Sequence, residues 1–239
     1  MKNPPKPRTC LKFMGLLFSC SLFFNLVFPL LAQNSSPLPW HRFFENSEPP
    51  TEPQGNPGDG GSRGDDICPI APNNLAVLKV WNIRPTLTWS GEITKLEIRE
   101  LDSRTNLWNQ RISDNNKVPS LSSDELKLYQ ITVETDLQPG QTYKWYFSDK
   151  PDGEYDEYLP VEFTIMTDRE RESIAQELQQ LEQELTAQNI TGDGAKLRRA
   201  DYFASQNLWL DFWQEVLSVE SPSEDLKALL TSTIGELCE

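Results

Sequence analysis

Between residues 68 and 166 the chain consists of short runs in which apolar and polar residues alternate. The clearest are residues 127–134, 142–148 and 159–166, where every second residue is apolar or aromatic. Because successive side chains of a strand point to opposite faces, each run offers one face to a core and the other to water. Shorter runs of the same kind are residues 75–80, 86–90, 94–100 and 107–112. The pattern predicts antiparallel sheets that pack around a shared core.

Seven such strands in about a hundred residues match an immunoglobulin-like or fibronectin-type-III-like β-sandwich. The segment Pro-Thr-Leu-Thr-Trp at 85–89 resembles the early core strand of fibronectin-type modules. The segment Leu-Gln-Pro-Gly-Gln-Thr-Tyr at 137–143 resembles their tyrosine corner, in which the tyrosine hydroxyl bonds to the backbone just upstream. We expect core positions for Trp89 and Trp145. Trp108 lies in an expected edge strand, so its side chain is either packed in the core or exposed to solvent.

A helical pattern begins at Thr167. The sequence Thr-Asp-Arg-Glu from Thr167 to Glu170 fits a capping box, and acidic residues in the first turn suit the helix dipole. The apolar residues that then recur every three or four positions are Ile174, Leu178, Leu181 and Leu185. They form one narrow stripe on a helix. Thr-Gly-Asp-Gly at 191–194 ends this helix, and Ser-Pro-Ser-Glu at 221–224 begins the last one.

Between these signals, residues 195–206 and 208–219 are typical of a helical hairpin, with Asn207 at the bend, where a left-handed residue is tolerated. The spacing of Phe203, Asn207, Trp209 and Phe212 resembles the turn of a tetratricopeptide repeat, with Ala200 and Ala204 as small packing residues. Two positions depart from the repeat: Asn207 stands in place of the usual bend glycine, and Phe212 in place of a small residue. One hairpin cannot form a solenoid, so a helical cap with apolar seams is the alternative. The predicted fold class is therefore β plus α, with a sandwich at residues 67–166 and a small helical domain at residues 167–239.

Residues 1–32 have the order of a secretory signal peptide. Four basic residues lie within positions 2–12, and a mostly apolar run follows at 13–31, just before the small residue Ala32. This order predicts cleavage near Ala32 and a secreted or periplasmic location, with an uncleaved membrane anchor as the alternative. Residues 33–66 hold six prolines and five glycines, a content that prevents a packed core, so we predict a disordered linker there.

Removal of the signal peptide would leave two cysteines, Cys68 and Cys238. An even pair in an oxidising compartment favours a disulfide. Such a bridge would tie the start of the folded part to the penultimate residue of the chain. The alternative is two buried free thiols.

The charge of the chain disfavours several classes of partner. There are 22 basic and 36 acidic residues, a formal charge of −14, and cleavage after Ala32 would remove four basic residues and leave −18. Such a surface repels phosphate backbones and anionic headgroups, so we expect neither nucleic-acid binding nor membrane binding once the signal is cleaved. The single histidine, His41, leaves little room for acid–base or metal chemistry.

Three short motifs lack the context that their chemistry needs. The G-x-S-x-G pattern at 60–64 has no strand before it and no helix after it, as a hydrolase nucleophile requires. The Arg-Gly-Asp tripeptide at 63–65 lies in the same linker, and the acidic residues at 151–157 lack the spacing of a calcium loop. We therefore predict no catalytic, cofactor-binding or metal-binding residue, and a chain that is not an enzyme.

Three large aromatic residues within five positions, Trp209, Phe212 and Trp213, form the predicted partner-binding site. One helix cannot turn all three into one seam, because Phe212 and Trp213 diverge by about 100°. One face of the helix would pack on Phe203 and the last helix. The other face would meet the sandwich, a protein partner or water. If a partner binds there, we expect an exposed aromatic patch.

The segments that occur together in one known family are Gly-Gly-Ser-Arg-Gly at 60–64, Cys68-Pro69, Arg84-Pro85-Thr86, the Leu-x-Pro-Gly-x-x-Tyr-x-Trp segment at 137–145, Tyr202-Phe-Ala204 and Leu208-Trp209. In this combination the chain resembles the cyanobacterial proteins grouped as domain of unknown function 928. The resemblance covers roughly residues 55–220. It implies an extracytoplasmic location and this fold, and no activity.

We expect an exported, non-enzymatic interaction or adaptor protein of the cell envelope, because sandwiches and helical hairpins present surfaces and the chain lacks the residue types that most catalysis needs. The alternative is an envelope carbohydrate-binding module or a weak glycan hydrolase. Exposed Trp108 and Tyr146 beside a carboxylate pair would favour that alternative. A purely structural envelope protein is a third hypothesis.

Overall fold

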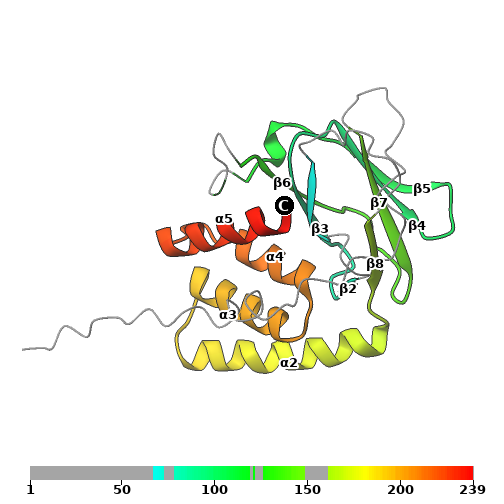
Figure 1. Ribbon diagram of the computed structural model, residues 1–239. Coiled ribbons are helices and arrows are strands. Elements are labelled where there is room, and N and C mark those ends of the chain that lie inside the picture. Colours follow the sequence, from blue (N-terminus) through cyan, green and yellow to red (C-terminus); the bar gives the residue numbers. More distant parts are fainter. Residues whose placement is uncertain (1–66, 73–77, 119–120, 122–125, 149–160, 239) are drawn as a thin grey trace, which may run out of the picture. The chain divides into compact units, whose positions relative to one another are not determined.

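The computed structural model describes residues 67–72, 78–118, 121, 126–148 and 161–238 (Figure 1). The predicted signal peptide, the linker with its short motifs and the acidic segment at 151–157 lie outside the described residues. The strands are β1 (Cys68–Ala71), β2 (Leu78–Val80), β3 (Thr86–Ser90), β4 (Lys95–Glu100), β5 (Asn106–Arg111), β6 (Leu128–Thr132), β7 (Thr142–Ser148) and β8 (Val161–Ile165).

Within the described residues these strands form two sheets. A three-stranded sheet has the order β1-β3-β6, and a five-stranded sheet has the order β2-β8-β7-β4-β5. All pairs are antiparallel except β2 and β8, so the five-stranded sheet is mixed rather than antiparallel as predicted. The difference arises because the first strand is divided between the sheets: β1 pairs with β3, and β2 then runs in the same direction as β8 in the other sheet.

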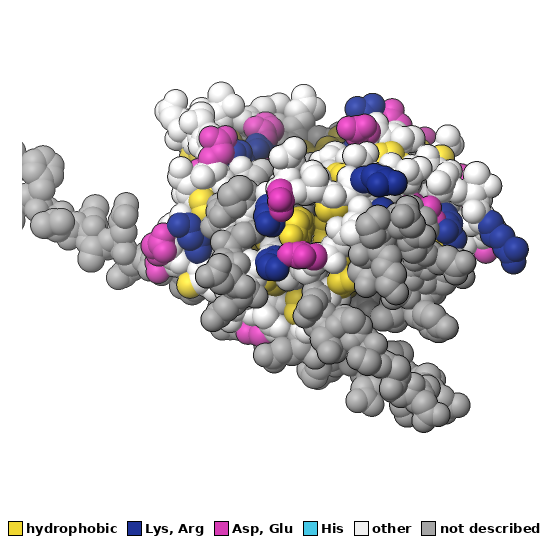
Figure 2. Space-filling view, turned by 90° about the horizontal axis from the view of Figure 1, so that it is seen from above, with side chains coloured by type: hydrophobic (Ala, Val, Ile, Leu, Met, Phe, Trp, Pro, Cys, Tyr) yellow, Lys and Arg dark blue, Asp and Glu magenta, His cyan; other side chains and the backbone are white. Residues whose placement is uncertain are grey.

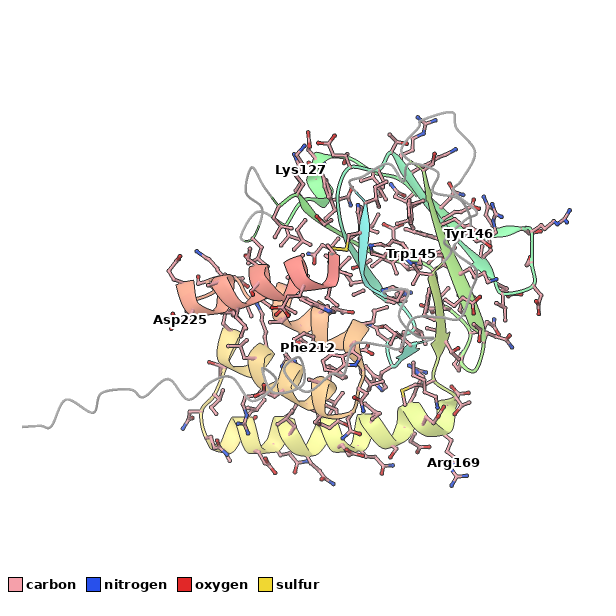
Figure 3. The ribbon with its side chains drawn as sticks, in the orientation of Figure 1. Lys127, Trp145, Tyr146, Arg169, Phe212 and Asp225 are labelled. Atoms are coloured by element: carbon pink, nitrogen blue, oxygen red, sulfur yellow. A yellow bond between two sulfur atoms is a disulfide. The ribbon has the colours of Figure 1, made fainter. Side chains whose placement is uncertain are left out.

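Two tryptophans mark where the sheets face each other. Trp89 of β3 and Trp145 of β7 are both fully buried, and their ring centroids lie 6.3 Å apart. Tyr129 of β6 stacks on Trp89 at 5.7 Å, and Figure 3 shows Trp145 in the interior beside β7. The core positions predicted for Trp89 and Trp145 are therefore confirmed. Aromatic pairs of this kind add to the stabilisation that burial alone provides.

The turn before β7 has the hydrogen bond expected of a tyrosine corner. The backbone N–H of Gln138 donates to the Tyr143 hydroxyl oxygen at 2.8 Å. Gly140 sits in this turn with a φ of 79°, a left-handed conformation that glycine adopts without a Cβ penalty. Its N–H donates to the carbonyl of Ile165 at the end of β8, at 2.9 Å. These bonds fix where β7 starts relative to β8.

The helices are α2 (Asp168–Ala187), α3 (Gly192–Ser205), α4 (Trp209–Leu217) and α5 (Glu224–Cys238), and a short 3-10 helix, η1, spans Asp114–Asn116. The predicted capping box opens α2: the Glu170 N–H donates to the Thr167 hydroxyl, and the Thr167 N–H donates to the Glu170 carboxylate at 2.9 Å. The left-handed bend predicted at Asn207 is present, with a φ of 57°. Within the described residues, no helix combines the length and hydrophobicity needed to cross a membrane.

Helices α4 and α5 cover the three-stranded sheet on the face away from the five-stranded sheet (Figure 1). α4 contacts β1, β2 and β3, and α5 contacts β1. Thr86 and Thr88 of β3, whose side chains alternate with the inward Leu87 and Trp89, are buried as well. The hydrophobic core therefore continues from the space between the sheets into the helices. The chain has a β plus α fold.

Candidate functional site

Two of the three aromatic residues predicted to bind a partner are core residues. Phe212 and Trp213 are 0% and 2% exposed, whereas Trp209 is half-buried. Their helix, α4, packs against α3 on one side and the strands on the other, and the rings of Phe212 and Trp213 lie 5.4 Å apart. In Figure 3, Phe212 lies among the helices and strands, while Arg169 points outward. Phe212 and Trp213 are thus covered within the fold, on a helix that contacts both α3 and the strands, and they form no exposed aromatic patch. Of the three residues, Trp209 is the one whose side chain is partly exposed.

A hollow of about 300 Å³, the Trp209 hollow, lies beside this residue. Its lining is mostly apolar and comes from β2, the residue after β8, α2 and the turn between α3 and α4. The lining residues include Leu78, Lys79, Met166, Ile174, Leu208 and Trp209. β2 is an edge strand of the five-stranded sheet. The hollow therefore brings an edge of the sheets together with the turn of the helical hairpin. Its volume is at the lower end of that of ordinary ligand pockets, and suits a single apolar side chain of a larger partner.

Helix α2, which contributes Ile174 to the Trp209 hollow, carries more carboxylates than basic side chains. Lys79 is ion-paired with Glu170, and this hydrogen bond, with those from Thr167, lowers the pKa of Glu170 to about 2. The further exposed carboxylates of α2 belong to Asp168, Glu172, Glu177, Glu182 and Glu184. On the face drawn in Figure 2, acidic and basic side chains are interspersed. The excess of carboxylates on α2 favours a partner that brings lysine or arginine.

Asp211, the one acidic residue of α4's apolar first half, joins the helices to the strands. It is 3% exposed, and its carboxylate accepts hydrogen bonds from the backbone N–H groups of Trp81 at 2.9 Å and Asn82 at 3.0 Å. Burial raises the pKa of Asp211 to about 7, although these hydrogen bonds act in the opposite direction. Arg171 of α2 adds a second link: its Nε donates to the Trp81 carbonyl at 2.9 Å, and the Trp81 indole N–H donates to the Arg171 carbonyl at 3.1 Å.

Sequence reasoning missed Asp211. The available signal was a carboxylate between Leu210 and Phe212, beside the broad apolar face of an amphipathic helix whose other polar residues are Gln214 and Glu215. A charged residue in such a place is almost never fully buried unless it has partners. Nothing in the sequence pointed to those partners, because Trp81 lies 130 residues earlier in the chain.

A second hollow, the β5–β6 hollow, has a volume of about 400 Å³ and a mostly polar lining. Its lining includes Trp108 and Gln110 of β5, Asn115 and Asn116 of η1, Gln130 of β6 and Glu134 just after β6. Four of these six side chains end in an amide. Among the described residues of the lining, Glu134 is the one carboxylate, so these residues do not supply the pair of carboxylates on which glycoside hydrolysis depends.

The two aromatic residues that would favour a sugar-binding protein have different surroundings. Trp108 is 8% exposed, since it faces inward on β5, and its remaining surface contributes to the β5–β6 hollow. Tyr146 of β7 is half-buried, and the Arg99 guanidinium lies over its ring, 4.3 Å from the centroid. Arg99 is also ion-paired with the buried Glu97. The two aromatics therefore do not form one platform.

The two cysteines, Cys68 at the start of β1 and Cys238 at the end of α5, are brought together. Their Cα atoms lie 5.5 Å apart, within the range that a disulfide spans, and the sulfurs lie at bonding distance (Figure 3). The bond connects residues 170 positions apart. It links the three-stranded sheet to the last helix, on the side where α5 contacts β1.

Among the described residues, no group of three or more histidine, cysteine or acidic side chains is arranged to hold a metal ion. No model of a known protein family matches the chain, and no curated protein matches its sequence. The resemblance to domain of unknown function 928 therefore stays a prediction that rests on the residues quoted for it.

Proposed function

We propose that this chain is an exported, non-enzymatic interaction protein of the cell envelope, and that it binds a protein partner at the Trp209 hollow. Export is supported by the basic and then apolar order of residues 1–32. The observation that carries the binding site is the position of the hollow, at the turn of the helical hairpin and beside the edge strand β2. Protein interfaces often contain an apolar pocket, bordered by a few polar groups, that receives one large side chain of the partner.

The finer fold assignment is part of this proposal. An immunoglobulin-like or fibronectin-type-III-like sandwich is supported by the sheet orders, in which β1, β3 and β6 face β8, β7, β4 and β5, and by the tyrosine corner at Tyr143. A tetratricopeptide-like hairpin is supported by the left-handed Asn207 and by the burial of Ala200 and Ala204 on α3. Membership of the cyanobacterial family named above belongs to the same proposal.

The partner we propose is a protein segment with one apolar side chain next to lysine or arginine. The apolar side chain would enter the space between Leu78, Ile174 and Trp209. The basic residues would meet the carboxylates of α2, and this attraction would mainly speed association and add specificity. A partner of this kind also suits a chain whose formal charge is −14.

The test is capture of envelope proteins by the full-length chain, exported through its own N-terminal region. Intact-mass analysis should first show a chain that begins at Gln33. A specific partner should be captured by the parent protein and by Leu107→Ala, which removes an exposed apolar side chain on β5, 41% exposed and far from the hollow in sequence. Trp209→Ala should reduce capture at least tenfold.

A second variant separates binding from folding. Gln206 is exposed and lines the Trp209 hollow, so Gln206→Lys should leave the melting temperature unchanged while it narrows the hollow and repels a basic partner. Loss of capture by both Gln206→Lys and Trp209→Ala supports the proposal. Retention of the same partner by both variants would show that the hollow is not its binding site.

A further inference from the structure

We propose that the β5–β6 hollow binds a neutral oligosaccharide. This inference rests on the non-enzymatic binding role proposed above, but it concerns another surface. β2, which borders the Trp209 hollow, and β5 are the two edges of the five-stranded sheet. The ligand class follows from how the fold makes this hollow and from the chemistry of its lining.

The hollow exists because the two sheets have unequal widths. In the described residues, β5 ends the five-stranded sheet and β6 ends the three-stranded sheet opposite. The register of β4 and β5 places Trp108 opposite Ile98 and Gln110 opposite Leu96, so these side chains share the inward face of the sheet with two core residues. Trp108 is largely covered, but Gln110 is exposed. The inward face of the five-stranded sheet is covered by the three-stranded sheet, but at β5 this cover is incomplete and the side chain of Gln110 is exposed.

The lining offers many hydrogen-bonding groups and little charge. A side-chain amide both donates and accepts hydrogen bonds, and so does a hydroxyl group, so amides match a ligand that carries several hydroxyls. Gln110 and Asn115 supply such amides from two different segments, β5 and η1. Trp108, which is 8% exposed, adds only a small apolar surface to the lining, so the amides carry the argument. This combination is typical of sites for polyhydroxylated ligands.

The charged side chains at the hollow favour a ligand without charge. Lys117 lines it, but its ammonium is ion-paired with Asp114 at 2.9 Å, which raises the pKa of Lys117. Glu134 is exposed and acidic, and the chain as a whole is strongly negative. An anionic ligand would be repelled, and a cationic one would face the lysine. A neutral saccharide is repelled neither by the carboxylates nor by the Lys117 ammonium.

One amide of the lining, that of Asn116, is held in place before any ligand arrives. The Asn116 amide oxygen accepts the Ser113 N–H at 3.1 Å, and its amide nitrogen donates to the Gln130 carbonyl of β6 at 3.4 Å. Just beyond, Lys117 forms a β-bridge with Tyr129. Asn116 is therefore a positioning residue that fixes η1 against β6. A site that is already ordered loses less conformational entropy when it binds.

The test is a titration of the full-length, exported protein, isotopically labelled, with cellohexaose, maltohexaose and mannohexaose, each to about 10 mM, followed by amide chemical shifts. We expect saturable shifts at the side-chain amides of Gln110 and Asn115 with at least one of these saccharides. We expect no shift with a hexagalacturonate of the same length. Gln110→Ala and Asn115→Ala should each weaken binding at least fivefold.

The matched control is Asn109→Ala, because Asn109 is exposed on β5 next to Gln110 but points to the opposite face. It should bind as the parent does. Equal weakening by Asn109→Ala, no shift with any neutral saccharide, or shifts away from the hollow would overturn the proposal. A peptide of alternating valine and threonine tests the other use of this edge strand. Backbone shifts along β5 with this peptide, and no shifts with saccharides, would also overturn the proposal, because β5 would then be a peptide-binding edge. Gln206→Lys changes the Trp209 hollow and not the β5–β6 hollow, so it should bind the saccharide as the parent does, whether or not it captures a partner. The two proposals can therefore fail independently of each other.

Discussion

The Asp211 carboxylate on α4 accepts a hydrogen bond from the backbone N–H of Trp81, 130 residues earlier in the chain, at 2.9 Å. Its other oxygen accepts from the next N–H, that of Asn82. Asp211 is buried, so an N–H left without this acceptor would lose a hydrogen bond where water does not replace it. The carboxylate therefore holds α4 against the turn that follows β2.

Replacement of Asp211 should be among the most destabilising single changes outside the aromatic core. Asp211→Ala removes the acceptor of two N–H groups and leaves a small void, so we expect the free energy of unfolding to fall by roughly 2–4 kcal/mol. Urea unfolding measures this. Asp225→Ala, in the exposed first turn of α5, is the control and should change stability by no more than about 0.5 kcal/mol. Similar stabilities of the two variants would contradict the role assigned to Asp211.

Asp211 should also make stability depend on pH. Its pKa is raised to about 7 in the folded protein, and it returns to roughly 3.9 when the chain unfolds. Between these values the folded state binds more protons than the unfolded state. Stability should therefore decrease as pH rises from about 4 to about 7, by up to about 1.4 kcal/mol per pH unit, and this group should add no slope above that window.

The measurement is urea unfolding of the parent and of Asp211→Asn across this range of pH. The parent should lose stability relative to the variant as pH rises. Asp201, whose pKa burial raises to about 6, contributes a slope of the same sign, but it is present in both proteins and cancels in the difference. Parallel curves for the two proteins would mean that Asp211 does not carry the raised pKa.

Features that depend on a few neighbouring residues could be predicted from the sequence. The alternation in β7, the hydrogen bond of Tyr143, the capping box at Thr167 and the left-handed bend at Asn207 are each determined by local backbone chemistry. Propensity, strand period and turn chemistry act over such short distances. The class of these elements was therefore readable before their partners were known, whereas β1 and η1 were not predicted.

Features that depend on which surfaces meet could not be predicted. Phe212 and Trp213 lie on the broad apolar face of an amphipathic helix, a pattern that indicates burial but does not show which surface covers that face. The parallel pairing of β2 with β8 arises from long-range topology. Trp108 was expected at an edge, and it does lie at an edge, but it faces inward. The hollow beside it combines three segments that no local pattern connects.

The tyrosine corner yields a further prediction. Tyr143→Phe removes the hydroxyl that accepts the Gln138 N–H and keeps the buried ring, so unfolding free energy should fall by about 1–2 kcal/mol. Tyr146→Phe on the same strand is the matched control. Its ring faces Arg99, and the ring is retained, so the effect should be within about 0.5 kcal/mol. Equal effects in thermal unfolding would show that the Gln138 bond contributes nothing particular.

The bond between Cys68 and Cys238 should add several kcal/mol to the free energy of unfolding. It closes a loop of 170 positions, and a chain-entropy model assigns such a loop on the order of 5 kcal/mol, with measured values for disulfides more often about 2–4 kcal/mol. Peptide mapping of the exported protein without reductant should recover the two cysteines in one linked pair. Substitution of both, Cys68→Ser with Cys238→Ser, should lower the free energy of unfolding by an amount in this range. The parent should lose the same amount when dithiothreitol is added, and the double variant should not respond to it. Two alkylatable thiols in the native exported protein, or a double variant as stable as the parent, would contradict the bridge, because the thiols would then be free or the loop would add no constraint to the unfolded chain.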